Sequence, residues 1–313
     1  MTAIALEEIE TARDRIAGRV RRTPLLRTRH LLTPLHEGLL LKLECLQVTG
    51  SFKARGAMNA VLSLDEEQIS RGIITASGGN HGIAVAFAGW SVGAPTVIYL
   101  PRSAPQEKAD RLKAWGAELV IEGEGWDEAN AAAMVQADAQ GLAYIHPFKD
   151  PAVIAGQGTL GLEMLRQDKG LEVLLVAIGG GGLISGVASA VKAVKPEIRV
   201  IGIEPVGAPT LKESLAAGEL VTLPQIETRA GTLAPRRSAE INLDIIGQNV
   251  DDIVLVSDEE MAAAARWLWF EMGIAAELSG AAALAAVQAG HISFEPGTSV
   301  AALVCGAGRD GIA

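Results

Sequence analysis

The sequence is poor in several features that would assign a chain to a narrow class. It has two cysteines, Cys45 and Cys305, without a CxxC spacing, so no disulfide framework is expected and a reducing cytoplasm fits. Basic residues are fewer than acidic ones, 27 against 37, and the formal charge is -10. That balance argues against nucleic acid or an anionic membrane surface as the main partner, although it leaves anionic small molecules open. Heptads, low-complexity tracts and strict repeats are also missing.

Targeting signals are missing as well. The beginning of the chain carries Glu7, Glu8 and Glu10 and lacks the basic region and apolar core of a signal peptide. One stretch, 173–191, has no charged residue, and a membrane-spanning helix needs about 20 apolar residues. Four consecutive glycines lie in the middle of that stretch, so a buried strand, a glycine turn and a helix explain it better. We therefore expect a cytoplasmic protein with no membrane partner.

The sequence does have enough apolar residues for a packed core. Hydrophobic residues make up 49% of the 313 residues and charged residues 20%, which is typical of a globular chain longer than one average domain. From residue 71 onward, short strand patterns alternate with helical ones. The expected strands are 73–76, 96–100, 118–121 and 143–145, and the expected helices are 83–90, 106–115 and 126–139. This alternation predicts right-handed βαβ units and a mostly parallel sheet.

A break in composition at 146–151 predicts a crossing between two domains. Before residue 71 we expect a helix over 4–20, a strand over 39–44 and a helix after Gly50. Between 205 and 250 the sequence predicts irregular structure with one short helix near Thr210. The other elements expected after the break are helices over 153–167, 183–194, 257–272 and 280–289 and strands over 173–178, 199–203, 252–256 and 299–304.

Lys53 lies at the beginning of a predicted helix. Ser51 is interpreted as the N-cap, because a small hydroxyl residue directly precedes the helical pattern. A lysine in the first turn meets the positive end of the helix dipole, which disfavours the ammonium and favours the neutral amine. An amine with a lowered pKa is what a Schiff-base lysine needs. The alternative is an exposed lysine whose aliphatic stem reaches out to water.

Two glycine-containing turns follow strands and precede helices. In Ser77-Gly78-Gly79-Asn80-His81-Gly82 the backbone N–H groups can converge on an anion, and the alternative is a tight turn without a ligand. In Gly179, Gly180, Gly181 and Gly182 four glycines allow main-chain N–H groups to surround a phosphate. No Lys-Ser/Thr pair follows, so this is not a P-loop, and the GxGxxG register also fails. Glu204 lies where a ribose-binding acid would, so dinucleotide binding stays open.

One long ungapped string carries a resemblance to a known family. Lys42-Leu43-Glu44, followed by Gln47-Val48-Thr49-Gly50-Ser51-Phe52-Lys53-Ala54-Arg55-Gly56-Ala57, resembles the cofactor-lysine segment of fold-type II pyridoxal-phosphate enzymes. Within them it is most similar to the serine/threonine dehydratase and serine racemase branch, over about residues 5–310. The resemblance implies an α/β fold like the tryptophan synthase β chain. Two domains would hold open, twisted, mostly parallel sheets with helices on both faces: a large cofactor-binding domain from 1–64 and 147–313, and a small substrate-side domain from 65–146.

The resemblance also implies a role for each motif. Lys53 would be the catalytic lysine bound to pyridoxal 5′-phosphate, with Phe52 beside it and the tetraglycine turn around the phosphate. Asn80 would bond the 3′ oxygen of the cofactor, and Cys305 would lie beside the pyridine nitrogen, unless it is simply a small buried residue. The residues expected to hold the substrate carboxylate are Ser77, Gly78, Gly79, Asn80 and His81. Several relatives bind a cation near the positions of Glu204, Ala208 and Thr210, but Thr210 lacks the charged oxygen, so no metal is expected.

The implied reaction is the α,β-elimination of a β-hydroxy amino acid, such as L-threonine or L-serine, to a 2-oxo acid and ammonia. Racemases of this branch carry a serine immediately before the Gly-Asn-His sequence, where this chain has Gly78, so weak racemisation is expected. Alternatives are serine racemase, a dehydratase for 3-hydroxyaspartate, phenylserine or a hydroxyectoine-derived substrate, and a β-replacement synthase. A homodimer or homotetramer is expected. No regulatory domain is expected after residue 313, and hence no feedback by isoleucine.

Overall fold

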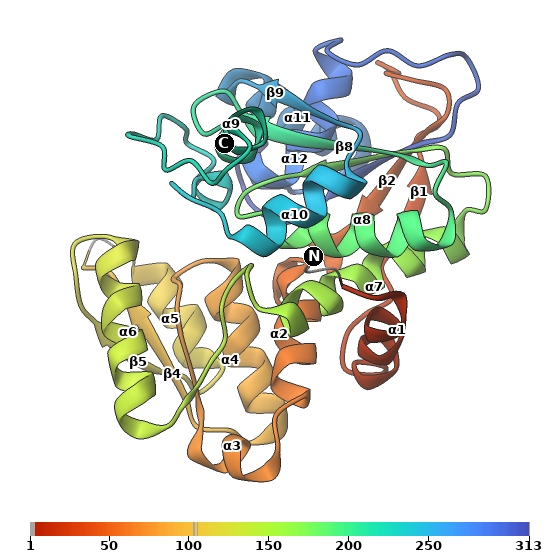
Figure 1. Ribbon diagram of the computed structural model, residues 1–313. Coiled ribbons are helices and arrows are strands. Elements are labelled where there is room, and N and C mark those ends of the chain that lie inside the picture. Colours follow the sequence, from red (N-terminus) through yellow and green to blue (C-terminus); the bar gives the residue numbers. More distant parts are fainter. Residues whose placement is uncertain (1–3, 103, 105, 313) are drawn as a thin grey trace.

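The computed structural model describes residues 4–102, 104 and 106–312. Figure 1 shows two lobes, each with its own sheet and its own helices. The sheets have six and four strands and are parallel except for one antiparallel edge strand. The chain is therefore the α/β protein with two mostly parallel sheets that the sequence predicts. The domain boundaries at 64/65 and 146/147 stay a prediction.

The larger sheet combines strands from both ends of the chain. Its order is β1-β2-β10-β7-β8-β9, and β1 is the antiparallel edge strand. Three central strands, β2, β10 and β7, are buried along their whole length, as strands covered on both faces are. The sequences of β7 and β10 are entirely apolar, and β2 is apolar except for Lys42. The strands of this sheet are β1 (Leu25–Arg27), β2 (Leu39–Leu43), β7 (Val173–Ala177), β8 (Arg199–Pro205), β9 (Asp252–Val256) and β10 (Val300–Val304).

The smaller sheet is built from one continuous segment. Its order is β5-β4-β3-β6, and every neighbouring pair is parallel. The strands are β3 (Ile73–Ala76), β4 (Thr96–Leu100), β5 (Glu118–Ile121) and β6 (Ala143–Tyr144). The helices of this lobe are α3 (Glu66–Arg71), α4 (Asn80–Val92), α5 (Gln106–Ala114) and α6 (Trp126–Gln140). Strands and helices alternate here as the sequence predicts.

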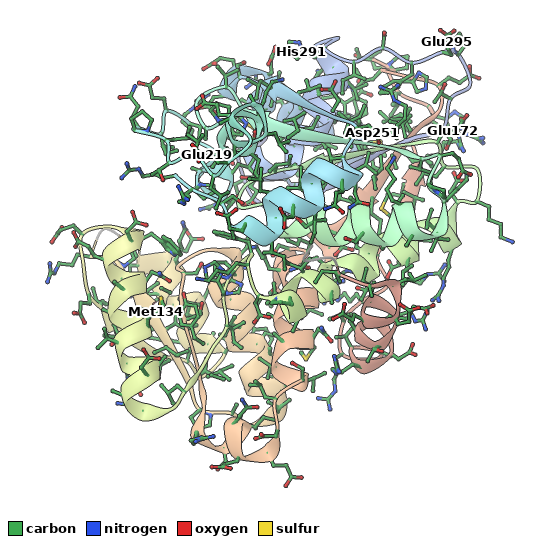
Figure 2. All side chains as sticks on the ribbon, viewed as in Figure 1. Met134, Glu172, Glu219, Asp251, His291 and Glu295 are labelled. Atoms are coloured by element: carbon green, nitrogen blue, oxygen red, sulfur yellow. The ribbon has the colours of Figure 1, made fainter. Side chains whose placement is uncertain are left out.

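Helices cover the larger sheet and join the two lobes. Among them, α12 packs along β7, β8, β9 and β10, while α8 packs against β7 and against α7 and α10. Charged side chains such as Glu172, Glu219 and Glu295 lie on the outside (Figure 2). The remaining helices are α1 (Leu6–Arg15), α2 (Lys53–Leu62), α7 (Pro151–Gln167), α8 (Gly182–Val194), α9 (Thr210–Ala217), α10 (Glu240–Asn249), α11 (Asp258–Met272) and α12 (Leu278–Gln288).

Helix α2 lies between the lobes, because it packs on α7 on one side and on α4 of the smaller lobe on the other. It crosses α7 closely through two glycines. A Cβ on Gly56 would lie 2.7 Å from the carbonyl oxygen of Val153, and a Cβ on Gly156 would lie 2.7 Å from the Cα of Gly56. Neither position can hold a larger residue without moving the helices apart. The close crossing fixes the first turn of α2, and with it Lys53, at the junction.

Three expectations need correction. Ser51 is not the N-cap of α2: Phe52 is, and Ser51 instead pairs with Gly306 in an isolated bridge because its backbone is fully extended. The segment 205–250 contains a second helix, α10, whose buried face includes Leu243 and Ile246. Helix α1 ends at Arg15 rather than near residue 20.

The uncharged stretch 173–191 is β7, the glycine turn and part of α8, as expected. None of the described helices combines the length and apolar character that a bilayer crossing demands.

Candidate active site

A cavity of about 1150 Å³ lies at the junction of the lobes, and every residue proposed from the sequence for the site lines it. The β3–α4 turn belongs to the smaller lobe. The start of α2 lies between the lobes, and the β7–α8 turn and the end of β10 belong to the larger one. These are the carboxyl ends of parallel strands, where ligand sites of open α/β sheets form. The sequence-predicted lining residues are Phe52, Lys53, Ser77, Gly78, Gly79, Asn80, His81, Gly179, Gly180, Gly181, Gly182 and Cys305.

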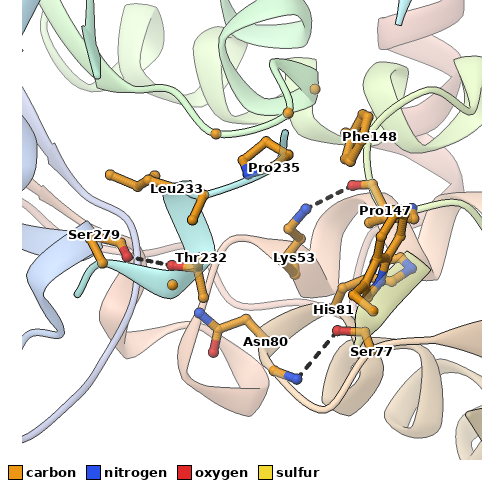
Figure 3. Close-up of a pocket in the computed structure, with 18 of the residues that line it drawn as sticks. Lys53, Ser77, Asn80, His81, Pro147, Phe148, Thr232, Leu233, Pro235 and Ser279 are labelled. Carbon is orange, nitrogen blue, oxygen red and sulfur yellow. Dashed lines mark hydrogen bonds between the residues drawn. The ribbon is translucent and has the colours of Figure 1, made fainter. Parts of the chain in front are cut away.

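Lys53 is the first residue of α2, as its motif predicts. Its amine donates a hydrogen bond of 2.7 Å to the carbonyl oxygen of Pro147 (Figure 3) and lies 5.2 Å from the centre of the Phe52 ring. Burial lowers the pKa of this amine to about 8, because the charged form loses its hydration. The backbone N–H of Phe52 donates to the carbonyl of Cys305 at 3.2 Å, which ties the start of α2 to the end of β10. The site therefore holds a rigidly placed amine that is partly neutral at neutral pH.

The tetraglycine turn connects β7 to α8, which begins at Gly182. Gly181 has φ of +94°, a backbone angle that side chains rarely tolerate, and a Cβ on Gly180 would lie 2.3 Å from the Phe148 ring. The carbonyl of Gly180 accepts hydrogen bonds from Ser238 Oγ at 2.9 Å and Asn242 Nδ2 at 2.8 Å, which hold the turn in place. The first N–H groups of a helix have no partner within the helix. The turn can therefore present backbone donors, at the positive end of α8, to an anion.

The second turn connects β3 to α4, and Asn80 is the first residue of that helix. The N–H of Gly79 donates to Ser77 Oγ at 3.3 Å. Asn80 Nδ2 donates to a carboxylate oxygen of Glu277 at 2.8 Å. His81 is buried and its Nε2 lies 3.0 Å from the carbonyl oxygen of Ile145. Burial lowers the pKa of His81 to about 3, so its ring is neutral and contributes no charge to the cavity.

Cys305 follows β10 and is almost fully buried. Its Sγ donates to the carbonyl of Ser279 at 3.4 Å. Burial raises the pKa of the thiol far above its usual value, with the neighbouring Glu277 as a second cause. The residue at this place in the cavity wall is therefore a neutral thiol and not a thiolate.

Several residues that line the cavity were not singled out in the sequence analysis. Glu277, just before α12, faces the cavity beside Asn80, and burial raises the pKa of its carboxyl to about 7. Thr232 belongs to a short 3-10 helix, Gly231–Leu233, before α10 and shares a hydrogen bond with Ser279 Oγ (Figure 3). Pro147 lies in the predicted domain crossing and its carbonyl accepts from Lys53. A glutamate directly before an apolar helix was the one available signal for Glu277.

Glu204 has a structural explanation. It lies fully buried near the end of β8, and its two carboxylate oxygens accept the N–H groups of Leu211 and Lys212 at 2.8 and 2.9 Å. These groups belong to the first turn of α9, so the carboxylate caps that helix. Burial raises the pKa of Glu204 to about 7. The capping accounts for an acid at this position without a ribose hydroxyl.

Comparison with known proteins agrees with this geometry. A family profile described as "Pyridoxal-phosphate dependent enzyme" matches residues 16–306. The chain is 40% identical to an L-threonine ammonia-lyase of Geobacter sulfurreducens over 295 residues, which cover 94% of this chain and 73% of that protein. It is 38% identical to a serine racemase of Arabidopsis thaliana, with 92% and 87% of the two chains covered.

The fold has close structural counterparts. A solved structure of maize serine racemase superimposes with a TM-score of 0.91 at 35% sequence identity, and covers 98% of this chain and 94% of the other. The agreement extends over both lobes and therefore over the cavity between them. The chain thus belongs to the fold-type II pyridoxal-phosphate dependent enzymes, in the threonine dehydratase and serine racemase family.

Proposed function

We propose that this enzyme catalyses the α,β-elimination of a β-hydroxy amino acid, such as L-threonine or L-serine, to a 2-oxo acid and ammonia. The observation that carries the proposal is the half-buried amine of Lys53, which lines one cavity together with two glycine-containing turns. Its pKa of about 8 suits a group that must give and take a proton near neutral pH. Similarity to an L-threonine ammonia-lyase supports the same reaction.

The residues of the cavity fit pyridoxal phosphate. The tetraglycine turn has the shape of an anion cradle: a Cβ on Gly179 would lie 2.7 Å from the carbonyl oxygen of Thr232, and one on Gly180 would enter the Phe148 ring. Such a cradle suits the phosphate group. Lys53 would hold the aldehyde carbon, Phe52 would lie beside it, and Asn80 and Cys305 would contact the ring. When bound, the cofactor supplies an electron sink for the electron pair released at the substrate Cα.

Residues of the chain would then carry out proton transfer and bind the substrate carboxylate. In its free form Lys53 Nζ would take the proton from the substrate Cα, because it is a base that lines the cavity and is partly neutral. The β3–α4 turn, with Ser77, Gly78, Gly79, Asn80 and His81, binds the substrate carboxylate through hydroxyl, amide and backbone donors. His81 is neutral, so it contributes a dipole or a hydrogen bond and no charge. Cys305 remains a thiol and, beside the pyridine nitrogen, would be a neutral partner rather than an acidic one.

Racemisation is the competing activity, and similarity to serine racemases supports it as the second candidate. A racemase needs a second group that can return a proton to the face of Cα opposite the lysine. Gly78 occupies the position of the serine that performs this in racemases of the family, and glycine has no side chain to donate from. We therefore propose elimination as the main reaction and racemisation as a weak one.

Several side chains of the substrate are compatible with the proposed reaction. The cavity is larger than threonine requires, and its lining includes Lys108, Arg229, Arg236 and Arg237. These cations keep an acidic substrate such as 3-hydroxyaspartate among the candidates, beside phenylserine and hydroxyectoine-derived amino acids. A β-replacement synthase is the more distant alternative. A homodimer or homotetramer in the cytoplasm is proposed as the working form.

The test is a screen of purified holoenzyme. L-threonine, L-serine, 3-hydroxyaspartate and phenylserine are supplied one at a time, and the release of 2-oxo acid and ammonia is measured, with sulfide added in a parallel series. Stoichiometric release from at least one hydroxyamino acid is expected. Faster formation of a thiol amino acid with sulfide, or faster inversion of L-serine than its elimination, would contradict the proposal.

A further inference from the structure

Glu277 is a carboxyl that the proposed reaction does not use, although it lies in the same cavity. It precedes α12 as its N-cap residue, but its side chain makes no capping hydrogen bond to that helix. The carboxylate instead accepts from Asn80 Nδ2 at 2.8 Å and from Thr232 Oγ1 at 3.4 Å. The N–H of Leu278 donates a hydrogen bond to Asp310 Oδ2 at 2.7 Å. Capping therefore does not explain why a half-buried carboxyl lines the cavity.

The place of the carboxyl is closely fixed by its surroundings. A Cβ on Gly306 would lie 2.3 Å from Glu277 Oε1 and 3.2 Å from Asn80 Nδ2, so carboxylate and amide both lie against the backbone that follows Cys305. The Thr232 hydroxyl also shares a hydrogen bond with Ser279 Oγ, which ties the segment before α10 to the start of α12. The pair formed by Glu277 and Asn80 is thus enclosed by β10, α12 and the Thr232 segment.

We propose that Glu277 is a positioning residue, which orients the side-chain amide of Asn80 and makes the hydrogen bonding of that amide depend on the protonation of the carboxyl. An ionised carboxylate only accepts, so it selects the Nδ2 side of the amide. A protonated carboxyl also donates, and then the Oδ1 side of the amide becomes an equal partner. Because Asn80 is proposed to contact the cofactor, the protonation of Glu277 changes what Asn80 offers to it. The inference rests on the proposed role of Asn80.

The electrostatic surroundings bring this change into the physiological range. Burial raises the pKa of Glu277 to about 7, and the charge of Asp310 also raises it, while the hydrogen bonds from Asn80 and Thr232 and the charge of Lys108 lower it. Cys305 is a further titratable neighbour and stays a neutral thiol, and Lys53 lines the same cavity with a pKa of about 8. Glu277 therefore changes charge near neutral pH, whereas an ordinary glutamate does so near 4.3.

The first experiment needs no cofactor. The chain has five asparagines, so the side-chain amides of apo-protein labelled with ¹⁵N-asparagine give few signals, and Asn80→Ala identifies the one from Asn80. In the wild type this signal is expected to shift with pH around a midpoint near 7. In Glu277→Gln it should remain but no longer titrate, since glutamine keeps an acceptor oxygen and does not ionise between pH 5 and 9. An Asn80 signal that is flat between pH 5 and 9 in the wild type, or that still titrates in Glu277→Gln, would overturn the proposal.

Asp310→Asn is the matched control, because it changes a neighbouring carboxylate and leaves the Asn80 contact in place. Loss of the Asp310 charge should lower the pKa of Glu277, so the Asn80 midpoint is expected to move to lower pH without disappearing. An unchanged midpoint would count against Glu277 as the titrating group. This variant also keeps the proposal testable if Glu277→Gln fails to fold.

A second readout uses the holoenzyme. The visible absorption of the bound cofactor is expected to change with pH over the same range in the wild type. In Glu277→Gln the cofactor should still bind, but that spectral change should vanish. A Glu277→Gln spectrum that titrates like the wild type would contradict the proposal. A wild-type protein that binds no cofactor would contradict the proposed role of Asn80 instead, and the apo-protein amide signal would still test the pair.

Discussion

The amine of Lys53 is held 2.7 Å from the carbonyl oxygen of Pro147, a residue 94 positions further along the chain. Lys53 begins the helix between the two lobes, and Pro147 lies where the chain returns from the smaller lobe to the larger one. The hydrogen bond therefore fixes this amine relative to both lobes at once. Any movement of the smaller lobe that shifts Pro147 also changes the hydrogen bonding of Lys53.

The rate of cofactor capture is expected to follow the pKa of Lys53. Only the neutral amine attacks an aldehyde, and this lysine has a pKa of about 8, against about 10.4 for an unperturbed lysine. Chromophore formation by the apo-protein should therefore rise about tenfold per pH unit below pH 8 and level off above it. Stopped-flow absorbance with pyridoxal phosphate measures this. A rate that still climbs between pH 9 and 10 would mean that Lys53 is an ordinary exposed amine.

Gly180→Ala is expected to weaken cofactor binding by at least about tenfold, because ~1.4 kcal/mol is a modest cost for a Cβ placed 2.3 Å from the Phe148 ring. Equilibrium titration with pyridoxal phosphate gives the dissociation constant. Gly125→Ala is the control, since a Cβ there meets nothing within 4 Å and its φ of -131° suits any residue. Equal affinities in the two variants would argue against the tetraglycine turn as the phosphate site.

Gly78→Ser is expected to raise the racemisation of L-serine at least several-fold relative to elimination. A Cβ at Gly78 would lie 3.1 Å from Leu100 Cδ2 and 3.9 Å from Ala104 Cβ, so a small adjustment of the Leu100 side chain accommodates the serine. Chiral chromatography of serine and a 2-oxo acid assay on the same samples give the ratio. Gly78→Ala, with the same Cβ and no hydroxyl, is the control. A similar ratio in both variants would show that racemisation does not depend on a hydroxyl at this position.

Arg55→Met is expected to destabilise the protein by about 3–5 kcal/mol, because it leaves the buried carboxylate of Glu44 without its ion-pair partner. Arg55 Nη2 lies 2.8 Å from Glu44 Oε1 and 3.0 Å from Glu163 Oε2, and Glu163 also pairs with buried Lys42 at 2.5 Å. Denaturant unfolding measures the free energy. Arg71→Met breaks an exposed pair with Glu67 and should cost less than about 1 kcal/mol. Equal losses in both variants would show that the buried network adds no stability of its own.

Much of the fold followed from local patterns. The strands over 73–76, 96–100 and 118–121 have the predicted bounds, because each is a short apolar run between clear turn residues. Helix α10 was missed because its amphipathic pattern lies in a segment rich in glycine, proline and arginine, and packing against α8 and α9 stabilises it. The predicted N-cap of α2 was wrong because Ser51 pairs with Gly306 in an isolated bridge, and the local sequence does not reveal that pairing.

The site was predictable where one motif supplied several neighbours in sequence. Lys53, the β3–α4 turn and the tetraglycine turn are of this kind, and the fold brings all of them to one cavity. Glu277 was not predictable in this way, because its partner Asn80 lies 197 positions away and only the folded chain joins them. The same holds for Pro147 and Thr232, which enter the site through the packing of the two lobes.

The covalent link between Lys53 and pyridoxal phosphate tests the central claim most directly. Holoenzyme is reduced with borohydride, digested, and analysed by mass spectrometry for peptides that carry a pyridoxyl group. The account predicts one dominant modified peptide, with the label on Lys53, and no label at that site in unreduced protein. A label on another lysine, or no labelled peptide from a protein that binds the cofactor, would contradict it.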